Sequence, residues 1–358
     1  MFKVLGLLIL VVALSPGAEI IGYVFAQDAV LNPADIAAEK LTRINYAFAN
    51  LRDGKVVEGF AHDAENFAVL NGLKTRNPNL KVLVSVGGWT WSGAFSDASL
   101  TAASRKVFVD SAVAFVEKYK LDGLDIDWEY PGLVGAGNVF RPEDKQNYTA
   151  LLRELRKAFN REGKQLHRHL YSSVATGGGA DFVAHTELAK VARAVDSVNL
   201  MSYDYYEPTD DKIAGHHAPL LTNPADRKGI SADASVKMYL EAGVPARKLI
   251  LGVPFYGHAW TTDGLYKAAV GAQIPTNFHD ITGSMTAGNG YVRYWDSAAS
   301  VPYLYNSTTR LFVSYEDPES LALKCKYVRK HKLGGVMFWD YAGDSNGALL
   351  SAIYAGLK

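Results

Sequence analysis

Three acidic residues alternate with apolar ones in the segment Leu121–Pro131, which reads LDGLDIDWEYP. In an extended strand successive side chains point to opposite faces, so Asp125, Asp127 and Glu129 share one face. Second neighbours on a strand lie about 6.5–7 Å apart, which lets these carboxyl groups lean into contact. The residues between them are apolar, and other structure should cover the face that they form. We therefore expect the acidic face to be shielded from bulk water.

Carboxyl groups crowded in such a place cannot all ionise freely, because burial and like-charge repulsion raise at least one pKa. A general acid that works near neutral pH requires such a pKa. A solvated strand end is the usual explanation for two acids spaced in this way, but the longer string with Asp122, Gly123 and Trp128 favours a catalytic site. A divalent-metal site is disfavoured, because the alternate positions are bulky and apolar and the glycine of a calcium loop is missing. The sequence thus predicts no metal ligands and no cofactor.

The segment DGLDIDWEYP resembles the catalytic signature DGxDxDxE of glycoside hydrolase family 18, the family of chitinases, at every signature position. SVGG at Ser85–Gly88 is similar to the family motif SxGG, and MSYD at Met201–Asp204 is similar to MxYD. Three further segments fall where the family carries substrate-pocket residues: Asn45–Phe48, Pro254–Gly257 and Phe338–Asp340. The resemblance covers most of the chain.

This resemblance implies a role for each acidic residue. Glu129 matches the family's acid and would protonate the glycosidic oxygen, while the substrate's own 2-acetamido carbonyl would act as the nucleophile. Asp127 would accept a hydrogen bond from the acetamido NH and stabilise the positive charge that develops. Asp125 would hold or share a proton with Asp127. Tyr203 would hydrogen-bond the acetamido carbonyl, which completes the predicted catalytic set.

The same resemblance predicts a sugar pocket at the strand ends. Asp204 would support this pocket and Trp339 would form its floor. The remaining predicted substrate-binding residues are Tyr23, Phe48, Gly88, Trp89, Met201 and Tyr256. Aromatic faces stack on sugar rings while polar groups bind the hydroxyl groups. As in the family, cis peptides are expected near Ala47–Phe48 and Trp339–Asp340, and Asp122 is expected to be structural.

One position departs from the family pattern. Many relatives follow the Tyr-Gly of the seventh strand with Arg, but this chain has His258. The histidine would either replace the arginine as a pH-dependent contact or face a predicted insertion, and we favour the second.

Eight short strand-type runs recur along the chain, and helix-period segments such as Ala102–Lys118 fill most of the gaps. The runs are Ile20–Phe25, Arg43–Ala49, Lys81–Val86, Gly123–Trp128, Leu170–Ala175, Val195–Ser202, Leu249–Phe255 and Gly335–Trp339. Buried strands that alternate with helices pair in parallel, and eight such units predict an α/β fold, a closed (β/α)8 TIM barrel with its site at the carboxyl ends of the strands. An open doubly wound sheet is the alternative, but the first run lacks the Gly-rich phosphate loop of that fold.

Residues 258–316 break this rhythm, because they have no helical period and contain many aromatic and turn residues. Such an interval is too long for an ordinary loop, and disordered segments are poor in aromatics. We therefore predict a small α+β insertion domain between strand 7 and helix 7, which in the resembling group of chitinases forms a wall of the groove. The barrel domain would comprise residues 19–257 and 317–358.

Charge and composition restrict the partners. Lys plus Arg and Asp plus Glu both total 37, so there is no basic field for nucleic acid or an anionic membrane, and an uncharged partner such as chitin or chitooligosaccharides fits. Residues 1–18 resemble a secretory leader, with Lys3 before the apolar run Val4–Leu14, which is too short to span a bilayer. The chain is expected to be secreted, extracellular and monomeric. Asn147 and Asn306 begin glycosylation sequons.

Together these features predict a secreted endochitinase that hydrolyses β-1,4-linked N-acetylglucosamine polymers with retention, using Glu129 as general acid/base. A chitin-binding lectin on the same barrel is one alternative, although lectin relatives typically lose the acid that Glu129 supplies. An endo-β-N-acetylglucosaminidase acting on N-glycans is another, although such relatives usually lack the insertion.

Overall fold

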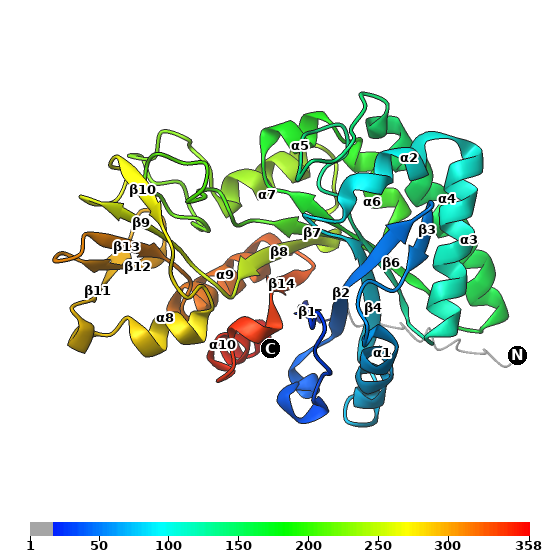
Figure 1. Ribbon diagram of the computed structural model, residues 1–358, viewed down its shortest axis with the longest axis horizontal. Helices are drawn as coiled ribbons and strands as arrows, with labels where there is room; N and C mark the ends of the chain where they lie inside the picture. The colour runs from blue at the N-terminus through cyan, green and yellow to red at the C-terminus, as the bar shows by residue number, and fades with distance from the viewer. Residues whose placement is uncertain (1–16) are drawn as a thin grey trace, which may run out of the picture.

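The computed structural model describes residues 17–358, and its centre is a closed barrel of eight parallel strands (Figure 1). The strands are β1 (Glu19–Phe25), β2 (Arg43–Arg52), β4 (Lys81–Gly87), β5 (Gly123–Asp127), β6 (Tyr171–Gly177), β7 (Ser197–Met201), β8 (Leu249–Pro254) and β14 (Gly335–Trp339). Strand β1 pairs with β14 on one side, where Glu19 lies opposite Gly335, and with β2 on the other, where Ile21 lies opposite Arg43. This double pairing closes the sheet, so the predicted (β/α)8 barrel is confirmed.

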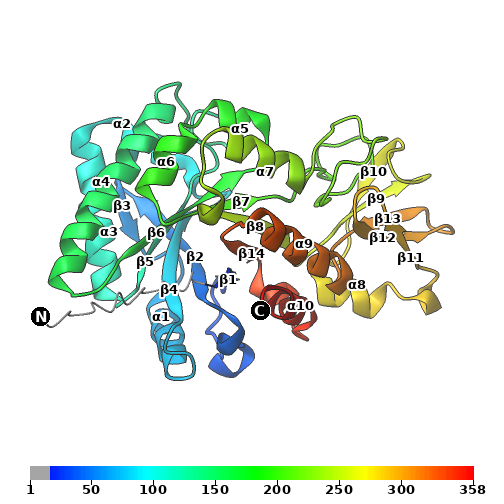
Figure 2. The same cartoon turned by 180° about the vertical axis from the view of Figure 1, so that it is seen from behind.

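Helices surround the barrel and connect its strands (Figure 2). They are α1 (Asp63–Gly72), α2 (Phe95–Leu100), α3 (Ala102–Lys118), α4 (Asp144–Gln165), α5 (Ala180–Ala184), α6 (Leu188–Ala194), α7 (Ala232–Glu241), α9 (Pro318–His331) and α10 (Ala348–Leu357). The first crossover differs from the others, because only two 3-10 turns, Pro33–Asp35 and Ala38–Lys40, separate β1 from β2. Ile36 leaves the helical region between these turns (φ −105°, ψ 114°) and is buried, so no regular α-helix continues there.

Local signals explain where the long helices begin and which side they bury. Thr101 and Ser104 form a capping box at the start of α3, and Asp317 and Ser320 form another at α9, where Pro318 takes the first helical position. Apolar residues recur every three or four positions on α3, and those that are buried include Phe108, Ala112, Phe115 and Val116. This pattern places the apolar side of the helix against the barrel.

Strand β5 has the two different faces that its alternating sequence predicts. Leu124, Ile126 and Trp128 are fully buried on the outer side of the barrel. The Trp128 ring stacks on Phe95 of α2 with centroids 5.3 Å apart, and Tyr148 of α4 lies at 5.5 Å. The acidic residues of the strand therefore point into the barrel.

Asp122, immediately before β5, is structural as predicted. Its carboxylate accepts the Val82 N–H at 2.8 Å and pairs with Lys74 Nζ at 2.7 Å and Arg168 Nη1 at 3.1 Å. These contacts join the amino ends of neighbouring strands, on the side opposite the predicted site.

An antiparallel sheet lies to one side of the barrel (Figure 1). Its strands in spatial order are β10 (Ala269–Ala272), β9 (His258–Thr262), β13 (Leu311–Ser314), β12 (Val301–Asn306) and β11 (Val292–Asp296), and α8 (Phe278–Ser284) precedes β11 in the chain. The fully buried Trp260 and Phe312 of this sheet share an apolar cluster with Tyr205 and Tyr206 from the loop between β7 and α7. Residues 258–314 thus build a sheet of their own, while the boundaries of an insertion domain stay a prediction. A short strand, β3 (Lys55–Val57), pairs antiparallel with β2 on the barrel itself.

The predicted secretory leader, residues 1–18, lies outside the described residues except for its last two. Within residues 17–358 no helix is long and apolar enough to cross a membrane. Both sequon asparagines are packed into the fold: Asn306 is buried and donates from Nδ2 to the Asn289 carbonyl oxygen at 3.0 Å, and Nδ2 of Asn147 is buried as well. Neither amide is accessible for glycosylation once the chain has folded.

Candidate active site

Asp125 lies at the base of the acidic face, where it is fully buried. Its carboxylate accepts hydrogen bonds from four strands: from Tyr23 Oη of β1 (2.9 Å), Ser85 Oγ of β4 (2.7 Å), Ser173 Oγ of β6 (2.5 Å) and Asn199 Nδ2 of β7 (3.2 Å). Burial raises the pKa of Asp125, and the hydrogen bonds from the hydroxyl groups oppose that rise. Ser173 and Asn199 were not predicted, although a polar residue within an apolar strand run signals a side chain that needs a partner.

Asp127 follows on the same face, between Asp125 and Glu129, and it is buried. Its Oδ1 atom has no hydrogen-bond partner among residues 17–358. Burial, followed by the charges of Glu129 and Asp125, raises the pKa of Asp127 well above its ordinary value. A buried carboxyl oxygen without a protein partner is available to an N–H group of a substrate.

Glu129 is the outermost of the three acids and is partly exposed. Burial is the largest cause that raises the pKa of Glu129 to about 7; a hydrogen bond with Tyr130 lowers it, and the charges of Asp204 and Glu207 raise it further. The Glu129 carboxyl group therefore keeps its proton up to near-neutral pH, which is the state that a general acid needs.

Two polar side chains hold the backbone of Glu129 in place. Ser92 Oγ, in the turn after β4, accepts the Glu129 N–H at 2.8 Å and donates to the Asp127 carbonyl oxygen at 3.0 Å. Asn138 Nδ2 donates to the Glu129 carbonyl oxygen at 2.6 Å. Neither Ser92 nor Asn138 was predicted, because both lie in turns whose contacts depend on the tertiary fold.

Gly88, predicted to bind substrate, packs against β5. Its N–H donates to the Asp127 carbonyl oxygen at 2.8 Å, and at its φ of 82° a Cβ would lie 2.7 Å from the Phe48 ring. Gly87 has a φ of 108°, and a Cβ there would lie 2.2 Å from the same Asp127 oxygen. Gly87 is therefore required for β4 to approach β5 this closely, and Gly88 leaves room for the Phe48 ring of β2.

Trp339 ends β14 and lies among aromatic rings from the first two strands. Its ring centroid is 5.9 Å from Tyr23, 5.5 Å from Phe25 and 5.4 Å from Phe48, on which it stacks. The barrel thus brings together the predicted Tyr23, Phe48 and Trp339, and adds Phe25. Such a ring of aromatic faces at the carboxyl ends of strands can hold the apolar face of a sugar.

Tyr203 follows β7 and packs with Met201 against the apolar residues inside the barrel. Its ring centroid lies 6.2 Å from that of Tyr256. Burial, followed by the charges of Asp204 and Asp127, raises the pKa of Tyr203 well above its ordinary value. The hydroxyl group therefore stays protonated and can donate a hydrogen bond.

Three non-proline peptide bonds are cis: Ala47–Phe48, Glu129–Tyr130 and Trp339–Asp340. The first and third are those predicted, and the second was not predicted. All three lie in or beside strands that carry site residues.

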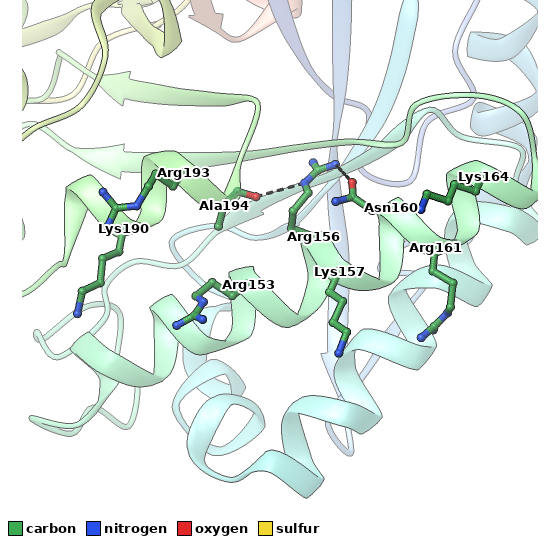
Figure 3. A pocket seen from close by; sticks show the side chains of 9 residues that line it. All are labelled: Arg153, Arg156, Lys157, Asn160, Arg161, Lys164, Lys190, Arg193 and Ala194. Carbon is green, nitrogen blue, oxygen red and sulfur yellow. Dashed lines mark hydrogen bonds between the residues drawn. The ribbon is translucent and has the colours of Figure 1, made fainter.

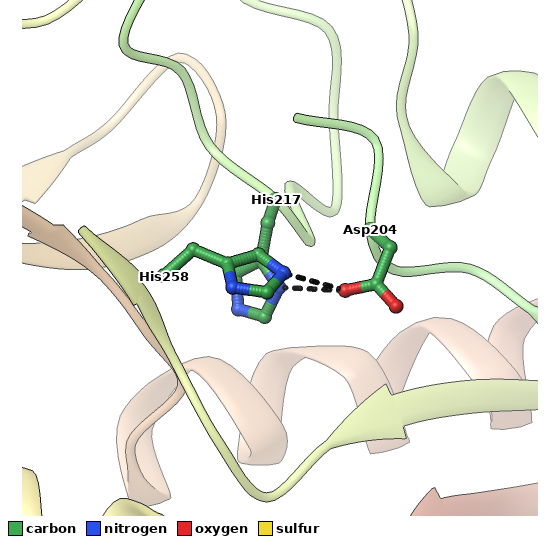
Figure 4. A group of neighbouring side chains, drawn as sticks. All are labelled: Asp204, His217 and His258. Carbon is green, nitrogen blue, oxygen red and sulfur yellow. Dashed lines mark hydrogen bonds and ion pairs between the residues drawn. The ribbon is translucent and has the colours of Figure 1, made fainter. Parts of the chain in front are cut away.

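Asp204 is the acceptor at the centre of a second polar cluster. Its carboxylate accepts Tyr256 Oη at 2.7 Å and lies 2.9 Å from His258 Nε2 and 3.5 Å from His217 Nδ1 (Figure 4). Burial alone would raise the pKa of Asp204, but hydrogen bonds and charges from His217 and His258 hold it well below its ordinary value. Burial lowers the pKa of His217 to about 4.

The prediction that His258 faces the second sheet is wrong, because its ring points to Asp204 (Figure 4). Tyr256 and His258 are two residues apart in extended chain, so their side chains share one face. A desolvated carboxylate needs donors, and both side chains supply one to Asp204. His217 was not predicted at all, since it belongs to the long β7–α7 loop.

The outer part of the site contains two further residues. Trp89, predicted to bind substrate, is 52% exposed and its centroid lies 6.4 Å from Tyr130, next to Glu129. Glu207 was not predicted; burial and the charge of Asp204 raise its pKa to about 7. Trp89 therefore presents an aromatic surface to solvent near Glu129.

A separate hollow of about 780 Å³ lies on the outer surface of α4 and α6 (Figure 3). It is lined by Arg153, Arg156, Lys157, Asn160, Arg161, Lys164, Lys190, Arg193 and Ala194. This basic lining suits anions, and none of the predicted site residues contributes to it. The uncharged sugar predicted as substrate therefore fits the barrel end and not this hollow.

We expect the pH profile to follow Glu129. Because burial raises the pKa of Glu129 to about 7, the acid form is present below that pH and is lost above it. kcat/KM on a chitooligosaccharide should therefore fall about tenfold per pH unit on the alkaline side. A profile that stays flat from about pH 6 to 9 would contradict this assignment.

A closed barrel with a column of carboxyl groups and a ring of aromatic side chains at one end has the architecture of a glycoside hydrolase. Residues 19–344 match the sequence profile of the glycosyl hydrolases family 18, and the chain belongs to that family.

Several relatives carry names that include an activity. Chitinase A1 of Niallia circulans is 40% identical to this chain. The match covers 91% of this chain and 56% of the length of that protein. A solved family 18 N-acetylglucosaminidase from Paenibacillus barengoltzii is 39% identical, with a TM-score of 0.88 over 95% of this chain and 100% of that one. Chitinase ChiA74 from Bacillus thuringiensis is 32% identical, with a TM-score of 0.90 over 95% of this chain and 70% of that one.

Proposed function

We propose that this chain is a secreted chitinase that hydrolyses β-1,4 bonds between N-acetylglucosamine units with retention. The observation that carries the proposal is the column Asp125, Asp127 and Glu129. Its outermost acid has a pKa raised to about 7, and one oxygen of its middle acid has no partner among residues 17–358. The names of the relatives from Niallia circulans and Bacillus thuringiensis support chitin as the substrate class.

In the proposed mechanism Glu129 gives its proton to the glycosidic oxygen as the bond to the anomeric carbon breaks. The carbonyl oxygen of the substrate's 2-acetamido group forms a bond to that carbon, which yields an oxazolinium ion and inverts the configuration once. Asp127 Oδ1 accepts the acetamido N–H, and Tyr203 donates to the acetamido oxygen. Glu129, now ionised, takes a proton from water, which opens the oxazolinium ring and restores the original configuration.

The products of chitohexaose test this proposal. Chromatography should show shorter chitooligosaccharides, and proton NMR recorded within the first turnovers should show new reducing ends in the β configuration. Products in the α configuration would contradict the substrate-assisted route. Failure to cleave chitohexaose or colloidal chitin, despite a folded protein, would contradict the proposed activity as a whole.

The Paenibacillus barengoltzii relative favours a second candidate, release of single N-acetylglucosamine units. Chromogenic N-acetylglucosaminide and chitobioside substrates separate the two activities, because a monomer-releasing enzyme cleaves the first and a chitinase prefers the second. A lectin would cleave neither. An enzyme acting on N-glycans would release glycans from a glycoprotein and leave colloidal chitin intact.

Trp89→Ala is expected to weaken binding of chitohexaose by about 3- to 10-fold, because one ring–sugar stacking contact is lost. Calorimetry in the background of an inactive Glu129→Gln variant measures this affinity without turnover. Tyr294→Ala provides the control, since Tyr294 is also exposed (42%) but lies on β11 of the second sheet. Equal affinities of the two variants would show that Trp89 does not contact the substrate.

A further inference from the structure

The geometry points to a binding site for a divalent transition metal ion, of which Zn²⁺ is the simplest probe, formed by Asp204, His217 and His258. One donor atom from each residue lies within 4.8 Å of the other two. The residues come from three segments: Asp204 follows β7, His217 belongs to the β7–α7 loop, and His258 begins β9. Figure 4 shows both imidazole rings directed at the same carboxylate.

The distances between the donor atoms fit such an ion. Tetrahedral zinc has bonds of about 2.0–2.2 Å to nitrogen and oxygen, so its donor atoms lie about 3.3 Å apart. Asp204 Oδ1 lies 2.9 Å from His258 Nε2 and 3.5 Å from His217 Nδ1, which brackets that separation. The two imidazole donors lie within 4.8 Å of each other, so an ion in the middle would require side-chain movements of about 1.5 Å at most.

The chemistry of the donors favours a transition metal over calcium or magnesium. Two imidazole nitrogens and one carboxylate oxygen suit zinc, copper or nickel, whereas the hard cations prefer oxygen ligands alone. His217 is fully buried, and its Nε2 atom has no hydrogen-bond partner within the described chain, so Nδ1 makes the ring's polar contact. That contact is the one with Asp204.

Packing holds the two rings in this arrangement before any ion arrives. The His217 and His258 centroids are 4.7 Å apart, and Tyr256 lies 5.4 Å from the first and 5.5 Å from the second. The Trp260 centroid lies 6.2 Å from that of His258. Little conformational entropy is then lost when the side chains coordinate a metal ion, which is the condition for a preorganised site.

A bound ion would interfere with the sugar pocket. Tyr256 Oη and the metal would compete for the Asp204 carboxylate, which belongs to the MSYD motif beside Tyr203. The metal should therefore inhibit hydrolysis, and the inhibition should be stronger at lower substrate concentration. This inhibition rests on the proposed function, whereas metal binding itself does not.

Calorimetry with zinc chloride tests the site on the full chain after treatment with EDTA, and the visible absorption of Co²⁺ reports the ligand geometry. Wild type should bind one zinc ion per chain. His258→Arg, which removes one imidazole ligand and keeps a long polar side chain, should weaken binding by about 100-fold or more. His169→Ala is the matched control, because His169 Nε2 lies 2.9 Å from Asp196 Oδ1 on the surface without a third ligand.

Asp204→Asn is a second variant, which keeps the shape of the side chain. It is needed if His258→Arg lowers the melting temperature of the protein. Loss of zinc binding in both variants, with full binding in His169→Ala, supports the site. Absence of zinc binding in wild type, or equal binding in wild type and both variants, would overturn it. Zinc that binds without slowing chitobioside hydrolysis would overturn the inhibitory role. If the protein has no hydrolytic activity, the proposed function fails, and the calorimetric result alone decides whether the metal site exists.

Discussion

Glu129→Gln is expected to lower kcat on chitohexaose by roughly three orders of magnitude, because glutamine cannot donate the proton that the leaving group needs. The side chain keeps its shape, and the backbone contacts of residue 129 with Ser92 and Asn138 do not involve the carboxyl group. Binding of chitohexaose should therefore stay within a few-fold of wild type. Steady-state kinetics and calorimetry measure the two quantities, and a variant with wild-type kcat would exclude Glu129 as the acid.

The same variant also tests the cause of the raised pKa. Because burial raises the pKa of Glu129 from 4.5 to about 7, the native protein binds this proton more tightly than the unfolded chain does. That stabilisation is complete below about pH 4.5 and is lost as the pH rises through about 7. Urea unfolding measures the free energy of unfolding of both proteins. The difference, Glu129→Gln minus wild type, should therefore be more positive at about pH 8 than at about pH 5. A difference that is independent of pH would contradict the assigned shift.

Asp125→Ala is expected to lower the free energy of unfolding by about 3–5 kcal/mol, because the buried carboxylate is the common acceptor of donors from four strands. Alanine would leave the hydroxyl groups of Tyr23, Ser85 and Ser173 buried without this acceptor. Urea unfolding at neutral pH measures the loss, and activity should fall as well, because Asp127 would lose its neighbour.

Asp125→Asn is the matched control for that loss. Asparagine retains one acceptor oxygen in the same place, so its destabilisation should be less than that of the alanine variant. If both substitutions cost under about 1 kcal/mol, the four hydrogen bonds do not stabilise the barrel core, and Asp125 serves catalysis alone.

Much of this architecture follows from local patterns. Apolar runs that alternate with helical segments predicted the barrel. The spacing of apolar residues in a strand or a helix shows directly which side of that element is buried. The alternation in Gly123–Trp128 predicted that Asp125 and Trp128 lie on opposite faces. The contacts of Asp125 with Tyr23 and of Trp128 with Phe95 of α2 confirm this.

Other features depend on contacts that no local pattern contains. Ser173 and Asn199 were missed because their partner, Asp125, lies 48 and 74 residues away in the chain. His217 reaches Asp204 from a loop without periodicity, and the orientation of His258 depends on that same carboxylate. A strand pattern shows that a side chain points inward, but the identity of its partner is set by which strands the closed sheet places opposite one another.

Strand β1 is the first element of the barrel to leave the ribosome, and β14, its partner, is the last strand to do so. While the chain is being synthesised, one edge of β1 has unpaired N–H and C=O groups, the kind of edge that recruits chaperones or other chains. The contact between Tyr23 and Trp339 can form only after the chain has been translated as far as residue 339. Truncation a few residues before Trp339 should therefore yield an aggregation-prone product that lacks the predicted pocket floor, and not a shortened enzyme.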